Sequence, residues 1–265
     1  MSWMRPLGST GMNVSALGLG TVKLGRDQGT KYPEGFTIPD DRSATALLAQ
    51  AKALGINILD TAPAYGKSEV RLGALLNGQR NDWLICSKVG EEFDAGSSHF
   101  DFSPEHTITS IERSLLRLKT DTIDMVLVHS DGNDLQIINQ HGTLEALELL
   151  KDRGLIRAFG MSTKSVPGGL AAAAASDLVM LTYNLKEQED AAVLDECIRL
   201  GKGAMIKKVF ASGHLAQDHA DPVQASMDLV FSHPGTSTAI IGTIRASHLK
   251  ANVLAARRAL GLGES

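Results

Sequence analysis

Three polar side chains each stand at the end of a short apolar run, where a buried strand would end. Asp60 ends the run that begins at Ile56, Lys88 ends the next run of this kind, and His129 ends a third. Tyr65 follows Asp60 within the same loop. Because side chains alternate along a strand, each strand-end residue shares a face with the residue two positions earlier. If these faces point inward, an acid, a cation, an imidazole and a phenol meet in one place.

These four groups could together move a proton to or from a substrate oxygen. A buried lysine beside a carboxylate stays charged, and its field lowers the pKa of a nearby phenol from the usual value of about 10. We therefore expect Tyr65 to donate and accept protons near neutral pH. His129 could orient or polarise the oxygen by a hydrogen bond. Taken singly, a strand-end Asp is more often a helix cap and a strand-end Lys reaches solvent, but four such groups on consecutive units favour a site.

The elements that would carry these residues alternate between short apolar runs and amphipathic segments. Near-continuous apolar runs are typical of parallel strands that are buried on both faces. Eight such units in 265 residues indicate an α/β fold, a closed (β/α)8 TIM barrel, with an open doubly wound sheet as the alternative. The eight expected strands are Ser15–Gly20, Asn57–Ala62, Trp83–Val89, Asp124–His129, Ala158–Ser162, Leu178–Asn184, Ala204–Val209 and Ala239–Thr243.

The remaining segments indicate what lies at the two ends of the barrel. The turn signal Gly8–Gly11 predicts an N-terminal β-hairpin that caps the barrel bottom. The segment Thr21–Asp40 is interrupted by glycines and prolines and is expected at the top, because irregular loops of that length are usually functional. We expect Asp41 and Ser103 to cap helices. The whole chain, residues 1–265, is expected to form a single barrel domain.

Composition excludes several classes of protein. The chain has 26 Lys and Arg against 30 Asp and Glu, a net charge of -4, and no basic run that would suit a nucleic acid. The start of the chain lacks a signal-peptide core, and the longest apolar stretch, Leu170–Ala175, is too short to span a membrane. Two cysteines without a CxxC pair argue against a disulfide framework and a zinc site. We expect a cytoplasmic protein that binds a small molecule rather than nucleic acid, membrane or metal, as a monomer or a homo-oligomer.

Longer motifs surround the four polar residues. They are Asp60–Gly66 with Ser68-Glu69, Ser87–Val89, Ser110–Leu118 leading through Asp121 and Asp124 to His129, Gly154–Ser162, Ser232–Gly235 and Ile241–Thr243. Taken together, these motifs resemble those of the aldo-keto reductase family over nearly the whole chain. The resemblance implies a (β/α)8 barrel that binds NADPH, with NADH as an alternative cofactor. It also implies that Asp60, Tyr65, Lys88 and His129 are the catalytic residues.

The resemblance further implies a set of cofactor contacts, some of which depart from the family pattern. Thr163 stands where the family usually has asparagine, and Met180 stands where a glutamine is common. Lys207 and Lys208 occupy the segment in which an aromatic residue often stacks on the nicotinamide. Alternation lets only one of these two lysines point inward, where it could reach a pyrophosphate or an anionic substrate. The expected cofactor-binding residues are Gly20, Thr21, Asp60, Ser162, Thr163, Met180, Lys208, Ser212, Gly213, Gly242, Thr243, Arg245, His248 and Asn252.

The residues also bear on the cofactor without reference to the family. A hydride must come from a cofactor, because no side chain can supply one. A Rossmann site is disfavoured, since Gly18-Leu19-Gly20 does not continue into a GxGxxG motif. The adenosine site, by contrast, is placed by the resemblance, because Gly242–Arg245 followed by Ser247-His248 and Asn252 is similar to that site in the family. Arg245 is then the expected ligand of the 2′-phosphate of NADPH, because its guanidinium suits phosphate and helix N–H groups assist. His248 and Asn252 would lie against the adenine.

We expect an NAD(P)H-dependent oxidoreductase that reduces aldehyde, ketone or sugar carbonyls by hydride transfer, with Tyr65 as proton donor. The alternatives are the reverse alcohol or sugar dehydrogenase and a cofactor-binding regulatory subunit with slow turnover. A third is a lyase that forms a Schiff base on Lys88, although Asp60 would keep that amine protonated. The residues expected to border the substrate are Val22, Lys23, Lys31, Tyr32 and Phe36.

Overall fold

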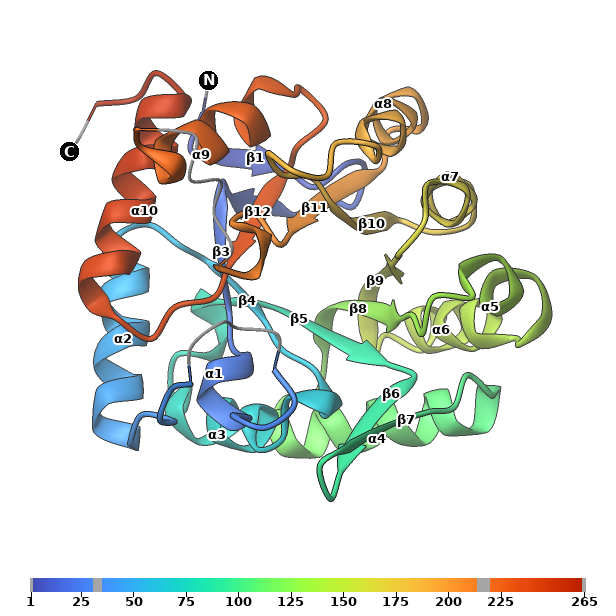
Figure 1. Cartoon of the computed structure of the whole chain (residues 1–265). Helices are drawn as coiled ribbons and strands as arrows, with labels where there is room; N and C mark the ends of the chain where they lie inside the picture. Colours follow the sequence, from blue (N-terminus) through green and yellow to red (C-terminus); the bar gives the residue numbers. More distant parts are fainter. Residues whose placement is uncertain (1, 31–34, 214–219, 264–265) are drawn as a thin grey trace.

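A closed barrel of eight parallel strands forms the centre of the computed structural model in the part of the chain that it describes, residues 2–30, 35–213 and 220–263 (Figure 1). Each strand pairs with its neighbour in the barrel sequence, and β12 pairs with β3 to close the sheet. This arrangement confirms the predicted (β/α)8 fold. The strands are β3 (Leu17–Gly20), β4 (Ile58–Asp60), β5 (Leu84–Val89), β8 (Ile123–His129), β9 (Ile156–Ser162), β10 (Leu178–Thr182), β11 (Gly203–Lys207) and β12 (Thr238–Ile241).

Helices cover the outside of the barrel, as Figure 1 shows. A helix in this position is expected to bury one apolar face. Helix α4 is typical: Ile111, Leu115 and Leu118 recur at helical spacing and are buried. None of the described helices is long and apolar enough to cross a bilayer. The helices are α1 (Val22–Gly25), α2 (Asp41–Ala53), α3 (Ser68–Leu75), α4 (Pro104–Leu118), α5 (Asp134–Gln140), α6 (Thr143–Asp152), α7 (Val166–Ala175), α8 (Ala191–Leu200), α9 (Pro222–Ser232) and α10 (Ala246–Ala259), with 3-10 turns at Pro63–Tyr65, Arg80–Asp82 and Ala211–Gly213.

Two helix starts test the predicted caps. Ser103 caps α4, because its hydroxyl oxygen accepts the backbone N–H of His106 at 3.2 Å. The prediction that Asp41 caps α2 is wrong by one residue. Asp40 is the cap, and its Oδ1 accepts the backbone N–H of Ser43 at 2.8 Å. The reason is local geometry: Asp40 has the extended backbone of a cap residue, so its carboxylate reaches back to the first turn, whereas Asp41 is already helical.

The N-terminal hairpin closes the end of the barrel at which the strands begin, as predicted. Its strands, β1 (Met4–Pro6) and β2 (Asn13–Ser15), pair antiparallel. Leu7, Met12 and Val14 are buried and reach the interior. They pack with the apolar side chains that fill the lower barrel, which are Ile58, Cys86, Met125, Leu127, Ala158, Leu178, Met180 and Met205.

A second hairpin, which the sequence analysis did not predict, follows the carboxyl end of β5. Its strands are β6 (Glu91–Asp94) and β7 (Ser97–Phe100), and they pair antiparallel. The same end of the barrel carries α1, which begins in the segment expected to be irregular. The two elements meet where the Arg26 guanidinium lies 3.4 Å from the centroid of the Phe93 ring. The upper end of the barrel is therefore bordered by two elements outside the eight repeated units.

Candidate active site

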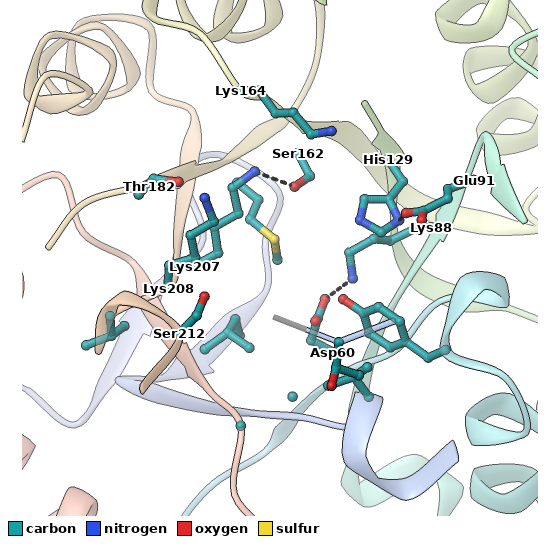
Figure 2. Close-up of a pocket in the computed structure, with 18 of the residues that line it drawn as sticks. Asp60, Lys88, Glu91, His129, Ser162, Lys164, Thr182, Lys207, Lys208 and Ser212 are labelled. Atoms are coloured by element: carbon teal, nitrogen blue, oxygen red, sulfur yellow. Dashed lines mark hydrogen bonds and ion pairs between the residues drawn. The ribbon is translucent and has the colours of Figure 1, made fainter. Parts of the chain in front are cut away.

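The ends of β4 and β5 bring a buried acid and a buried ammonium together (Figure 2). Asp60 is in register with Cys86, so Lys88 lies two positions further along the neighbouring strand. Lys88 Nζ donates to Asp60 Oδ1 at 2.5 Å and to the carbonyl oxygen of Thr61 at 2.9 Å. Burial lowers the pKa of the Lys88 ammonium, but the Asp60 carboxylate together with Tyr65 and Cys86 raises it by more, so that pKa lies above its ordinary value. The lysine therefore stays protonated although its side chain is only 1% exposed.

Tyr65 is positioned by the 3-10 turn that follows β4. The turn begins at Pro63, whose ring fixes the backbone φ angle, and ends at Gly66, which has a φ of +61°. A side chain at Gly66 would strike the end of α1, since its Cβ would lie 2.4 Å from a backbone oxygen there. The Tyr65 ring centroid lies 4.8 Å from Lys88 Nζ and 6.2 Å from the His129 ring, which meets it edge-on. The structure thus brings the four predicted catalytic side chains together.

His129, the last residue of β8, contacts an acid that the sequence analysis did not identify. Its Nδ1 lies 2.8 Å from Oε2 of Glu91, the first residue of β6. Burial lowers the pKa of His129, the Glu91 contact raises it, and Lys88 and Lys207 lower it, which leaves it below its ordinary value. Burial also raises the pKa of Glu91, but its contacts with His129 and Ser98 outweigh burial and bring that pKa to about 2.

A cavity of about 850 Å³ opens onto these side chains, and all four predicted catalytic residues line it. Val22 and Lys23, which were expected near the substrate, line it as well. Phe36 lies under the Lys23 ammonium at 5.0 Å, whereas Lys31 and Tyr32 fall outside the described residues. Among the expected cofactor-binding residues, those that line the cavity are Gly20, Asp60, Ser162, Met180, Lys208, Ser212, Gly213 and Gly242.

The other six expected cofactor-binding residues are not part of this lining. The Thr21 hydroxyl donates to the backbone carbonyl of Asp60 at 2.9 Å and lies 2.8 Å from the Ser68 hydroxyl, so it braces the end of β4. Thr163 contributes its backbone carbonyl, which accepts a hydrogen bond from Lys207 Nζ at 2.5 Å. The remaining four lie around the start of α10 and are Thr243, Arg245, His248 and Asn252.

The start of α10 has the chemistry of a phosphate site. No side chain caps the helix, and Arg245 occupies the cap position with an exposed side chain. Burial lowers the pKa of Lys23, and the nearby Arg245 cation lowers it further. Uncapped N–H groups at a helix N-terminus together with two neighbouring cations favour an anion. Because Gly242 lines the cavity just before this helix, the arrangement fits the expected place of a cofactor phosphate.

Lys207, the last residue of β11, is another lysine that lines the cavity. Its Nζ donates to the Ser162 hydroxyl at 2.9 Å (Figure 2). It also donates to the carbonyl of Thr163. Burial and the neighbouring Lys208 lower the pKa of Lys207 to about 7. Lys208 follows in the left-handed conformation, with a φ of +55°, and this change of backbone direction lets both lysines line one cavity. The alternation argument had allowed only one of them.

Six charged residues that line the cavity have no counterpart in the sequence prediction, and they are Arg26, Glu91, Lys164, Glu187, Glu189 and Asp190. Arg26 comes from the segment after α1, Glu91 from the second hairpin, and Lys164 from the loop after β9. Lys164 lies 6.0 Å from the Phe100 ring of the same hairpin. Glu91 had a weak signal in the sequence. It stands three residues after Lys88, the polar residue at the end of an apolar run that was itself predicted to belong to the site. Nothing local to Arg26 or Lys164 in the sequence indicates that these side chains reach the cavity.

Comparison with known proteins identifies the family. Residues 16–228 match the model of the Aldo/keto reductase family. The chain belongs to this family. Aldo-keto reductases with the most similar structures include the Pseudomonas aeruginosa protein PA4992, which is 53% identical with a TM-score of 0.89 over 97% of this chain and 95% of that one. The holo form of an aldo-keto reductase from Bacillus halodurans shares the fold, with a TM-score of 0.80 at 24% identity over 100% of this chain and 98% of that one.

Curated relatives of this chain match it over part of their length. The uncharacterized oxidoreductase YqkF of Bacillus subtilis is 34% identical over 60% of this chain and 48% of its own length. The L-galactose dehydrogenase of Arabidopsis thaliana is 37% identical over 60% and 48%, and the D-threo-aldose 1-dehydrogenase of Pseudomonas sp is 31% identical over 79% and 70%. The chain thus spans about half the length of the first of these relatives.

Proposed function

We propose that this protein reduces aldehyde, ketone or sugar carbonyls to alcohols with NAD(P)H, and that it catalyses the reverse alcohol or sugar oxidation when the cofactor ratio favours it. The observation that carries the proposal is the convergence of Tyr65, Lys88, Asp60 and His129 on one cavity. Relatives named as sugar dehydrogenases, and a methylglyoxal reductase of Escherichia coli that is 32% identical over 58% of this chain and 50% of its own, support the same class of reaction.

In the proposed reaction Tyr65 donates its proton to the carbonyl oxygen as that oxygen gains negative charge. The Lys88 ammonium, 4.8 Å from the ring centroid, stabilises the phenolate that remains. Asp60 holds the ammonium charged and in place. His129 orients the carbonyl oxygen through a hydrogen bond. In the reverse direction the phenolate takes the proton of the alcohol.

The cofactor we propose is NADPH, with NADH as an alternative; when bound, its nicotinamide supplies the hydride. The cations and uncapped N–H groups near Gly242 are the part of the structure that fits its phosphates, and Arg245 would bind the 2′-phosphate. Lys208, Ser212 and Gly213 would border the pyrophosphate. The residues that would contact the carboxamide are Ser162, Thr163 and Met180, and those that would contact the adenosine are Thr243, His248 and Asn252. Gly20, Thr21 and Asp60 would complete the cofactor site at the ends of β3 and β4.

The Tyr65→Phe variant tests this proposal. Removal of the proton donor is expected to lower kcat about 100-fold or more for every aldehyde and sugar of a substrate panel, because general acid catalysis typically contributes that much. Binding of NADPH and NADH, measured by nucleotide fluorescence, should remain as in the wild type. Tyr183→Phe is the matched control, since Tyr183 packs edge-on against His233 and does not line the cavity. Retained turnover in Tyr65→Phe would refute the proposed role.

Two alternatives give different results. A regulatory subunit would oxidise bound NADPH slowly even in a single turnover with excess aldehyde, whereas the proposed enzyme completes that turnover rapidly. A Schiff-base lyase would be trapped on Lys88 by borohydride. The ion pair between Lys88 and Asp60 opposes this chemistry, because it keeps the amine in its protonated, non-nucleophilic form.

A further inference from the structure

The second hairpin delivers one carboxylate to the imidazole of the active site. Strands β5 and β8 are neighbours, with Val89 in register with Val128, so the residues after them leave the barrel side by side. Gly90 makes the turn from β5 into β6 with a φ of +99°. A Cβ there would lie 2.5 Å from the ring of Phe102. A residue with a side chain would therefore clash with this ring, and it would also be strained by the positive φ angle. Glu91 is the next residue and lies beside His129 (Figure 2).

Both carboxylate oxygens of Glu91 are engaged. Oε2 lies 2.8 Å from His129 Nδ1, and Oε1 accepts a hydrogen bond from the Ser98 hydroxyl on the paired strand β7 at 2.6 Å. Nδ1 is buried, and its ion-pair contact among the described residues is with this carboxylate. The contact deviates from ideal hydrogen-bond alignment, but Oε2 still favours the protonated imidazole both as an acceptor and through its charge. Because the pKa of Glu91 lies at about 2, this negative charge persists at every pH at which the protein is expected to work.

Among the described residues, the other groups with the largest effect on His129 carry positive charge. Lys88 on β5 and Lys207 on β11 both disfavour the imidazolium, and the Tyr65 ring stands edge-on at 6.2 Å. Arg26 acts on Glu91 from the segment after α1 and favours its ionised form. Glu91 is therefore the anion that offsets two ammonium groups around the imidazole.

We propose that Glu91 is a positioning residue that holds the Nδ1–H of His129 on its carboxylate, leaves Nε2 for the substrate oxygen, and supplies the charge that lets the imidazole carry a second proton. In the singly protonated form Nε2 can only accept, which suits an alcohol. In the doubly protonated form Nε2 donates, which suits a carbonyl oxygen. The part of this inference that concerns substrate rests on the proposed function, whereas the coupling between Glu91 and His129 does not.

The test replaces Glu91 by Gln and follows His129 by NMR in histidine-labelled protein, with the His129 resonance identified by its loss in His129→Gln. Glu91→Gln keeps the size of the side chain and an acceptor oxygen but removes the charge. The titration midpoint of His129 should move down by about one pH unit or more, because an opposite charge at this distance shifts a pKa by about 1–3 units. On the alkaline side of the pH profile for carbonyl reduction, the fall in kcat/KM should shift to lower pH by the same amount. At a fixed alkaline pH, kcat/KM should therefore be about tenfold lower than in the wild type, while the Kd for NADPH stays unchanged.

Glu92→Gln is the matched control. Glu92 stands next to Glu91 on β6 but pairs with Arg113 and lies near His106, so this variant should leave the His129 midpoint in place. Glu91→Asp keeps the charge but withdraws it from Nδ1 by one methylene, so it should displace the midpoint in the same direction by a smaller amount, and it covers the case in which Glu91→Gln unfolds. An unchanged midpoint in Glu91→Gln, or in Glu91→Asp if Glu91→Gln does not fold, overturns the inference. A displaced midpoint in an enzyme without reductase activity would instead leave the coupling intact and refute the proposed function.

Discussion

The two ends of the barrel are each bordered by a β-hairpin, and the two hairpins do opposite things. The β1–β2 hairpin inserts Leu7, Met12 and Val14 into the end where the strands begin, and the interior there is apolar. The β6–β7 hairpin stands at the end where the strands finish and contributes a carboxylate to a cavity that already holds charged side chains. The same backbone device therefore completes a hydrophobic core at one end and a polar site at the other.

The difference lies in how each end offsets the cost of burial. Apolar side chains gain free energy when they leave water, so the lower end needs only close packing. A buried charge is costly unless it is paired. At the upper end Lys88 forms an ion pair with Asp60, and Glu91 lies beside His129. Among the described residues, the hydrogen-bond acceptors of Lys207 are the neutral groups of Ser162 and Thr163, and burial together with Lys208 lowers its pKa to about 7. Chemistry at this end depends on charges that the lower end does not contain.

The largest expected effect follows from breaking the pair at the upper end. Lys88→Met would leave the Asp60 carboxylate buried without its cation, which typically costs about 3–5 kcal/mol. The variant should show a lower free energy of unfolding in urea and lose carbonyl reduction together. If Lys88→Met kept wild-type stability in urea, the pair would not be the buried charge contact described above.

A substitution at the lower end should separate stability from activity. Leu7→Ala removes a side chain that is 0% exposed and should cost about 2–5 kcal/mol in urea unfolding. The kcat for carbonyl reduction, measured at a temperature at which the variant is folded, should stay within about twofold of the wild type. A large loss of kcat in the folded variant would show that the two ends are coupled, contrary to the comparison.

The smallest effect concerns pH. The pKa of Lys207 is lower in the folded than in the unfolded chain, so between about pH 7 and its ordinary value the unfolded chain binds more protons. This group therefore makes the free energy of unfolding rise with pH across that window. Lys207→Met should lack this contribution, and urea unfolding at pH 7 and pH 9.5 should show a smaller rise than in the wild type. Lys52→Met, at a half-exposed surface pair, should leave the wild-type rise unchanged.

Much of the molecule could be inferred from local patterns. The apolar runs predicted the eight strands, because parallel strands that are buried on both faces consist mostly of apolar residues. The polar residues at the ends of three of these runs predicted Asp60, Lys88 and His129. The cap of α2 shows the limit of such patterns. Two adjacent aspartates have the same propensity, and only the backbone conformation of Asp40 decided between them.

The sequence by itself determined the kind of barrel and the identity of the four central side chains, because periodicity and strand-end position are local properties. Only the tertiary structure decided that Glu91 meets His129, that Lys207 reaches Ser162, and that the hairpin after β5 exists at this rim. These contacts join residues that are 38 and 45 positions apart in the chain. Closure of the sheet brings these residues together in space, and no stretch of neighbouring residues in the sequence contains that information.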